Sequence, residues 1–529
     1  MNGTFRQSMG WLHTWAGLIV SSLLYFMFVT GSAGYFDTEI DRWMQPETVL
    51  AEGAETASMV LLAEQYVARQ VTDVESWRVS LPVGREPLLK VSWQDAQGER
   101  GETILNPHTG FPVVVRKTGG GQLLYAMHWR LHYFPYPVNR LLTSTAAMFM
   151  LIALITGIVV HKKIFKDFFT FRHSKQQRSW LDMHNLLSVL PLPFHLMITY
   201  SGLLYLASVT MMPAIITSSY GADWQIYFDQ RNNRAAIVEP AGKAVTQLPL
   251  AILISDVEQR WGKHSVKRVS VANSGDMNGR VNFVQSHPNG LDAGATLTYD
   301  SVSGEILDDT STQDLSLPTE IRNVVLALHE GLFAGWPLRW LYFLSGILGA
   351  GMIATGMILW VVKRRAKSER LGTPDKGLAL VENLNAGTII GLPIAIAVYF
   401  WANRLLAVNV TDRAGKEVAA LFITWAITLM YPIFRPARRA WIELLWAAAA
   451  VYSLLPIVNA FTTEHHLANS LAQGDWVMAG FDLTVLAFGA AFVLAAYYIQ
   501  EKKPYGQVKT LEKSEIEELV VAPNKVIAE

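Results

Sequence analysis

Long apolar runs dominate this sequence and restrict its fold more than any other feature. Crossing the hydrocarbon core of a bilayer takes about 20 residues of helix. Eight runs approach that length, near residues 12–35, 138–160, 184–211, 338–362, 384–406, 418–434, 441–460 and 476–499. Only 17% of the 529 residues are charged, whereas soluble domains average about 25%. The sequence therefore predicts an α-helical polytopic membrane protein with about eight spans.

Basic residues indicate how these spans are oriented. Clusters of Lys and Arg follow the second, fourth, sixth and eighth runs, at Lys162–Lys163, Lys363–Arg365, Arg435–Arg439 and Lys502–Lys503. Cytoplasmic connections carry an excess of such residues. We therefore expect both termini to be cytoplasmic, together with the loop 161–183, the linker 363–383 and a tail over 501–529.

The two longest connections are expected to lie outside the membrane, on the periplasmic side. They are residues 36–137, which end just before the second span, and residues 212–337, which end just before the fourth. Each contains one helical stretch and several strand-like stretches, and its last two strands flank a Gly-containing turn. The sequence predicts a small α+β domain in each, with no catalytic triad or phosphate loop.

Residues 11–362 have the pattern of an internal twofold repeat of one unit, which consists of a helix, an outer domain and a second helix. The interval from His13 to Gly31 equals the interval from His184 to Gly202. In the returning helices His132 precedes Gly157, and His329 precedes Gly356 at a closely similar interval. A parallel repeat of this kind implies a pseudo-twofold axis along the membrane normal.

The four repeated histidines are expected to form two layers. His13 and His184 lie near the cytoplasmic ends of their helices, and His132 and His329 lie at the periplasmic surface. Ionisable side chains in spans usually face the bundle interior. The chain has no cysteine, and two opposed imidazoles suit the axial positions of a b-type haem. We therefore predict two b-type haems, which pack against Gly31, Gly157, Gly202 and Gly356.

Other histidines are alternatives to this set. His128 precedes His132 by one helical turn, so either can be the outer ligand. His161 and His195 break the repeat. His195 lies so deep in its span that the cost of placing an ionisable side chain there requires an explanation. It is a candidate alternative ligand, haem propionate contact, or part of a quinone or proton site. The competing interpretation is that the small residues only let helices pack closely.

The last four runs form a membrane block over residues 384–500 that has no histidine within its spans. Asp482 is the acidic residue at appreciable depth there. We expect it either to pair with Arg404 or to reach the membrane interface.

Several motifs together resemble a known family, the PepSY-associated transmembrane proteins of bacterial inner membranes. They are "LHTWAGL", "LHYF", "LHEGLFAGWPLRWLY", the Thr-Gly dipeptides, and the outer segments "NPHTGFPV" and "YDSVSGEIL", within residues 1–365. The resemblance implies an inner-membrane location and bis-histidine b haems. It also implies electron flow from the cytoplasmic side to a periplasmic ferric siderophore, which releases ferrous iron for uptake. The added helical block is similar to members associated with ferripyoverdine reduction.

The resulting hypothesis is a haem-dependent ferric-siderophore reductase. No cytoplasmic segment is long enough for a flavin or nicotinamide domain, so the electron donor is expected to be a quinol or a separate cytoplasmic reductase. Other iron-uptake proteins of the membrane or periplasm are further expected partners. A net charge of zero gives no reason to expect nucleic acid. Two alternatives stay open: a siderophore or metal permease without redox chemistry, and a non-redox PepSY interaction or sensor protein.

Overall fold

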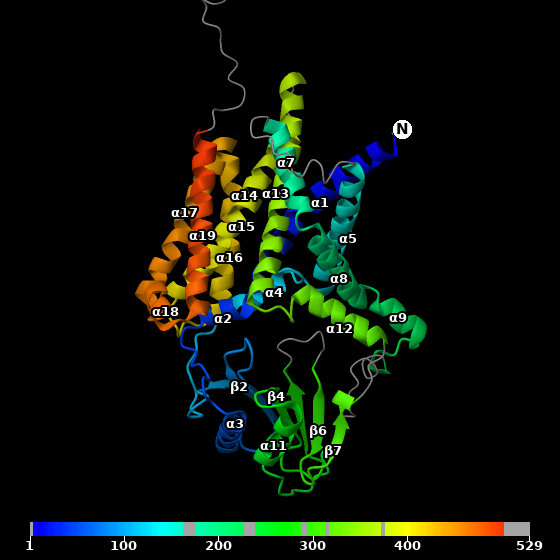
Figure 1. Ribbon diagram of the computed structural model, residues 1–529, viewed down its shortest axis with the longest axis vertical. Helices are drawn as coiled ribbons and strands as arrows, with labels where there is room; N and C mark the ends of the chain where they lie inside the picture. Colours follow the sequence, from blue (N-terminus) through cyan, green and yellow to red (C-terminus); the bar gives the residue numbers. More distant parts are fainter. Residues whose placement is uncertain are drawn as a thin grey trace, which may run out of the picture.

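The computed structural model describes residues 4–161, 176–226, 238–286, 294–312, 317–371 and 376–501. Figure 1 shows a bundle of long helices above a domain that contains a β-sheet. Helix α1 begins and α19 ends at the end of the bundle farthest from the sheet. We call that end the terminal side and the opposite end the sheet side.

The long helices match the predicted spans in number and position. In the described part of the chain, seven helices are long and apolar enough to cross a membrane, or eight if one bent pair counts as a span. The unbroken ones include α1 (Phe5–Gly34), α5 (Tyr136–Val160), α13 (Trp336–Leu371), α16 (Arg413–Met430), α17 (Ala437–Thr462) and α19 (Trp476–Glu501). Helices α14 (Lys376–Ile389) and α15 (Gly391–Leu405) together form another. The prediction of a multi-pass membrane protein is therefore confirmed.

The third span differs from the single helix predicted over 184–211. It consists of α7 (Gln176–Val189) and α8 (Leu192–Thr210), which are bent by 64° at the break. Pro191 caps α8, and Pro193 occupies its first turn. Proline has no backbone N–H to continue the ladder of α7, and its ring clashes with the preceding turn. The two prolines therefore explain why the helix breaks here.

The two outer segments contribute to one sheet. It has seven strands in the order β3-β2-β1-β4-β5-β6-β7, and β1 (Val74–Ser80) pairs antiparallel with β4 (Val266–Ala272). The other strands are β2 (Leu89–Asp95), β3 (Arg100–Leu105), β5 (Arg280–Gln285), β6 (Thr296–Asp300) and β7 (Ile306–Asp309). Helices α3 (Thr56–Gln70) and α11 (Leu250–Trp261) bury their apolar faces in a common core with the strands. The two expected α+β domains thus share one sheet and one core.

Short helices lie between the sheet and the spans. They are α2 (Asp37–Met44), α4 (Gly120–Met127), α9 (Met212–Ser219) and α12 (Leu317–Glu330) (Figure 1). The chain turns after α4 and α12 before it enters α5 and α13, which carry Pro137 and Pro337 in their first turns. Proline suits that position because the N–H it lacks would be unpaired there.

A buried polar network attaches the C-terminal block to the rest of the chain. Asp482 accepts hydrogen bonds from Trp43 Nε1 and Asn459 Nδ2, both at 3.0 Å. Arg404 Nε donates to Asn459 Oδ1 at 2.7 Å, and its guanidinium lies 3.7 Å from the Trp43 ring centre. The predicted relation between Asp482 and Arg404 is therefore indirect, through Asn459 and Trp43. α18 (Leu467–Gln473) closes this end of the block.

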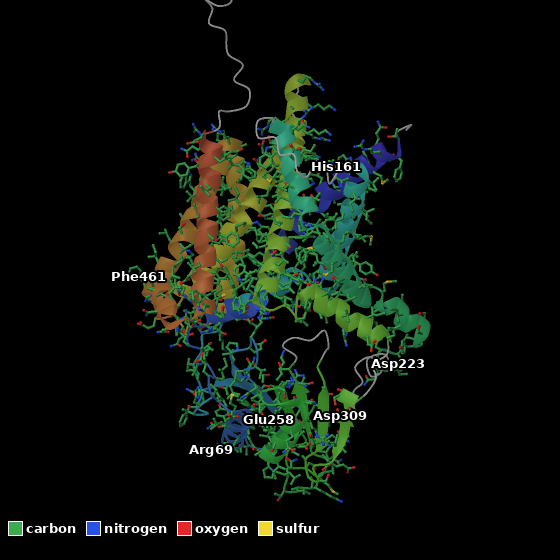
Figure 2. The ribbon with its side chains drawn as sticks, in the orientation of Figure 1. Arg69, His161, Asp223, Glu258, Asp309 and Phe461 are labelled. Carbon is green, nitrogen blue, oxygen red and sulfur yellow. The ribbon has the colours of Figure 1, made fainter. Side chains whose placement is uncertain are left out.

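Part of the basic pattern can be placed in the structure. Lys363–Arg365 lie near the end of α13, and Arg438 and Arg439 lie in the first turn of α17. Both sites are on the terminal side, while Phe461, near the other end of α17, lies on the sheet side (Figure 2). The predicted clusters at Lys162–Lys163 and Lys502–Lys503, most of the loop 161–183 and the tail after 501 fall outside the described residues.

The joined sheet yields a direct test. Arg78 of β1 faces Ser270 of β4, and antiparallel partners have Cα atoms about 4.5–5.5 Å apart. We predict that Arg78→Cys/Ser270→Cys forms a disulfide on mild oxidation, because that spacing suits the bridge and no native thiol competes. Cleavage at a protease site engineered between the two positions should leave fragments that separate on a gel only after reduction.

The matched control is Arg78→Cys/Asn282→Cys. Asn282 pairs with Ser270 from the far side, so it lies about 10 Å from Arg78. Cα atoms farther apart than about 7 Å cannot be bridged without backbone movement. Cross-linking of the control pair alone, or of neither pair, would contradict the β1–β4 pairing.

Candidate functional site: two histidine pairs

The inner histidine pair lies between helices α1 and α7. His13 of α1 and His184 of α7 have their ring centres 6.4 Å apart. Both rings line one cavity, together with Gly17, Gly157 and Gly356. The empty space in this cavity is about 1340 Å³, counting the part that opens to the surroundings. The structure thus brings these two predicted residues together, as expected.

Each inner ring is held by the returning helix of its own half. His13 Nδ1 lies 2.9 Å from the Ala153 carbonyl oxygen, and His184 Nδ1 lies 2.8 Å from that of Met352. A carbonyl oxygen only accepts, so Nδ1 carries the proton in both rings. Nε2, on the other side of each ring, keeps its lone pair. A second hydrogen bond that fixes the tautomer in this way is typical of metal-ligating histidines.

The outer pair contains His128 in place of His132. The ring centres of His128 and His329 are 6.3 Å apart, with an interplanar angle of 23°. Both residues line a second cavity, of about 1100 Å³ counting its open part, together with Gly31 and Gly202. His132 is exposed and stacks on Phe422, with ring centres 5.9 Å apart. The expectation that His132 faces His329 is therefore corrected in favour of its stated alternative.

The outer rings also present Nε2 as the lone-pair atom. His128 Nδ1 donates to the Tyr125 carbonyl oxygen. His329 Nδ1 lies 2.8 Å from Ser201 Oγ, and that hydroxyl donates to the Met197 carbonyl oxygen at 2.6 Å, so it accepts from His329. Burial lowers the pKa of both imidazoles to about 4, so both are neutral at pH 7.

The hydroxyl–glycine dipeptides serve as sockets for the histidines. In α5, Ala153 supplies the carbonyl, Thr156 Oγ1 lies 3.3 Å from His13 Nδ1, and a Cβ on Gly157 would lie 3.2 Å from His13 Cε1. A helical side chain leans toward the preceding turn. A glycine one turn after the carbonyl therefore leaves that oxygen open to the incoming ring.

The same socket recurs in two further helices. It consists of Met352, Thr355 and Gly356 for His184, and of Ile198, Ser201 and Gly202 for His329. Gly31 takes part differently, because a Cβ there would lie 3.4 Å from His128 Cβ. The predicted glycines thus leave room for the histidine side chains as well as lining the cavities.

A thin layer of side chains separates the two cavities. Leu24 and Met150 line both. At the spacing of the predicted repeat, Leu24 corresponds to His195 and Met150 corresponds to Gly349. His195 is fully buried, with Nε2 donating to the Ser345 carbonyl oxygen at 3.1 Å. It fits there because a Cβ on Gly349 would lie 2.8 Å from its Nε2.

His161 is at the edge of the inner cavity. It caps the end of α5 and lines that cavity on the terminal side (Figure 2). Among the predicted alternatives, His128 therefore joins a pair, His195 is buried beside Phe28 and lines neither cavity, and His161 lines the edge of the inner one.

One residue beside the outer cavity was not anticipated. Arg140 of α5 is only 7% exposed, and its guanidinium stacks over the rings of Trp129 and Tyr136 at 4.3 and 5.2 Å. A hydrophobic pattern cannot reveal it, because an arginine in the first turns of a span normally indicates an interfacial residue.

The geometry of both pairs fits ligation of one metal atom between two imidazoles. A metal–nitrogen bond is about 2 Å and a ring centre lies about 1 Å beyond its nitrogen, so such rings have centres roughly 6 Å apart. The described residues contain no group of three or more His, Asp or Glu side chains that could hold a bare metal ion. A porphyrin supplies the four remaining positions itself, and the residues at both sites fit a haem in this respect.

Comparison with known proteins places the chain. The family described as "PepSY-associated TM region" matches residues 10–363. The chain belongs to this family. The match ends with the fourth span, so the C-terminal block lies beyond it. The chain is also similar to "Uncharacterized protein PA4219" of Pseudomonas aeruginosa, with 25% identity over 395 residues that cover 71% of this chain and 94% of that protein.

The socket geometry predicts opposite effects of two similar substitutions. Gly157→Ala should lower the free energy of unfolding by about 1–3 kcal/mol, because the added methyl group overpacks against the His13 ring. Gly17→Ala has nothing within 4 Å of its new Cβ, so it should leave stability unchanged or raised through helix propensity. Thermal unfolding in detergent measures both. Equal midpoints for the two variants would contradict the socket.

Proposed function

We propose that this protein is a transmembrane haem reductase that passes electrons from the terminal side of the membrane to a ferric siderophore on the sheet side. The observation that carries the proposal is the presence of two pairs of imidazoles from different helices, with ring centres 6.4 and 6.3 Å apart. In each, Nε2 is the lone-pair atom. Bound b-type haems would supply one-electron chemistry at these positions.

The chain's own residues set the conditions for that chemistry. His13 and His184 would hold one haem, and His128 and His329 the other. Their Nδ1 hydrogen bonds fix ring orientation and increase ligand basicity. Only one layer of side chains, which includes Leu24, separates the cavities, so the two cofactors would lie close together.

The distribution of basic residues supports the membrane orientation that the proposed electron flow requires. Arg364, Arg365 and Arg438 lie on the terminal side, which the positive-inside rule assigns to the cytoplasm of an inner membrane. The sheet would then be periplasmic. The outer cavity is the one nearer to it, because Tyr125 and Glu330, from the short helices α4 and α12, line that cavity. A ferric complex would accept its electron there, and a separate reductase or quinol would donate on the opposite side.

Haem content tests the ligand assignment. The wild-type protein should purify red with two b haems per chain. His13→Ala/His184→Ala and His128→Ala/His329→Ala should each lose one of the two, because each pair holds one iron. Pyridine haemochrome spectra and protein assay give the ratio.

His132→Ala is the matched control, since His132 is exposed one turn from His128. It should retain both haems. Loss of one haem in His132→Ala, with both retained in a His128→Ala variant, would reverse the assignment. A colourless wild-type protein from haem-replete cells would contradict the function itself.

The reaction is tested with purified, dithionite-reduced protein from which excess reductant has been removed. Addition of a ferric siderophore should reoxidise the protein, and a ferrous chelator should trap about one Fe(II) per haem, because each haem carries one electron. The His128→Ala/His329→Ala variant should reoxidise at least tenfold more slowly. Reoxidation at the wild-type rate would contradict electron exit through the outer site.

A further inference from the structure

Arg140 is a buried cation without an anion. Its Nε and Nη1 are shielded from solvent and have no hydrogen-bond partner. Within the described residues, no carboxylate lies within ion-pair distance of it. The rings of Trp129 and Tyr136 hold the guanidinium flat but carry no charge that compensates it. An unpaired buried charge is strongly unfavourable, so the structure lacks its partner.

Arg140 lies beside the outer cavity. Thr143, Ala147 and Met150, which line that cavity, follow it at helical spacing, so Arg140 is on the same face of α5. Trp129, under its guanidinium, lines the same cavity and follows His128 directly. The charge of Arg140 also reaches His128, where it adds to the effect of burial in lowering the pKa of that imidazole.

We propose that Arg140 is the anchor for a carboxylate of the molecule bound between His128 and His329. This proposal rests on the proposed function, because the carboxylate is then a haem propionate. A guanidinium donates charge-assisted hydrogen bonds to carboxylate oxygens. The Nε and Nη1 of Arg140 are two such donors without a partner.

A second source of the same chemistry is the phosphate of a membrane lipid. Arginine and aromatic rings are common at the membrane interface. The near-complete burial of Arg140, with 7% of its surface exposed, favours an internal partner over a headgroup. The experiment separates the two sources by altering the propionates alone.

The experiment uses full-length protein from haem-deficient cells, in the His13→Ala/His184→Ala background, which leaves only the outer site. Haem and its dimethyl ester, in which both propionates are neutral, are titrated into detergent-solubilised protein. With Arg140 intact, haem should bind about tenfold or more tightly than the ester, because one charge-assisted pair is lost with the ester. With Arg140→Met, haem should bind as weakly as the ester, and ester binding should not change.

The unfolding midpoint of the haem-free protein is a second test. Replacing an arginine that only packs against its neighbours should lower this midpoint. Removing an unpaired buried charge should raise the unfolding midpoint of haem-free Arg140→Met above that of the parent. Arg130→Met is the matched control, because Arg130 is an exposed arginine shortly before α5. It should change neither the haem-to-ester ratio nor the midpoint.

The outcomes distinguish a failure of the proposed haem function from a failure of the Arg140 anchor. If wild-type protein takes up no haem, the proposed function fails. If it takes up haem but Arg140→Met keeps the preference for haem over the ester, only the anchor fails. Equal weakening of haem and ester by Arg140→Met, or loss of tightly bound phospholipid phosphorus from that variant, would assign Arg140 to packing or to a lipid headgroup.

Discussion

The hydrogen bond from a histidine Nδ1 to a helix carbonyl on the returning helix of the same half organises the centre of this protein. For such a bond, the carbonyl oxygen must accept a hydrogen bond from the histidine while it keeps the backbone hydrogen bond within its own helix. It also needs a gap in the side-chain cover of that helix. A glycine one turn later opens the gap, as Gly157 does for His13 and Gly356 for His184. The requirement fixes how closely the helices approach and therefore where the rings face each other.

The two segments that the sequence predicts to be repeats are joined at two levels. In the membrane the imidazole pairs face one another across the bundle, and outside it β1 and β4 complete one sheet. Because β1 pairs with β4, neither half of the sheet has an exposed inner edge. Residues from both outer segments also share one core. Continuous pairing restrains the relative position of the halves, and with it the distance between opposed histidines. The buried network around Asp482 then attaches the C-terminal block through Trp43 of α2.

Repeat spacing identified three of the four paired histidines but favoured His132 over its alternative His128 for the fourth, and the reason for that error is clear. The interval from His329 to Gly356 falls midway between the interval from His132 to Gly157 and that from His128 to Gly157. Both candidates depart equally from the repeat, so counting cannot choose between them. The choice depends on how the chain turns after α4 ends at Met127, which leaves His128 inward and His132 exposed. A loop conformation of this kind has no periodic signal.

The sequence by itself determined the spans, the inward histidines and the small residues beside them, because each depends on local composition or on a repeat. Only the tertiary structure decided that the outer segments form one sheet, that prolines bend the third span by 64°, and that Arg140 is buried without an anion. The shared sheet depends on contacts between residues far apart in the chain, and the burial of Arg140 depends on how the surrounding segments pack. The break in the third span is local, at Pro191 and Pro193, but its angle is a property of the folded chain. Hydropathy and spacing predict whether a residue is buried or faces the bundle interior. They do not predict which residue it contacts, because that depends on how distant segments of the chain pack together.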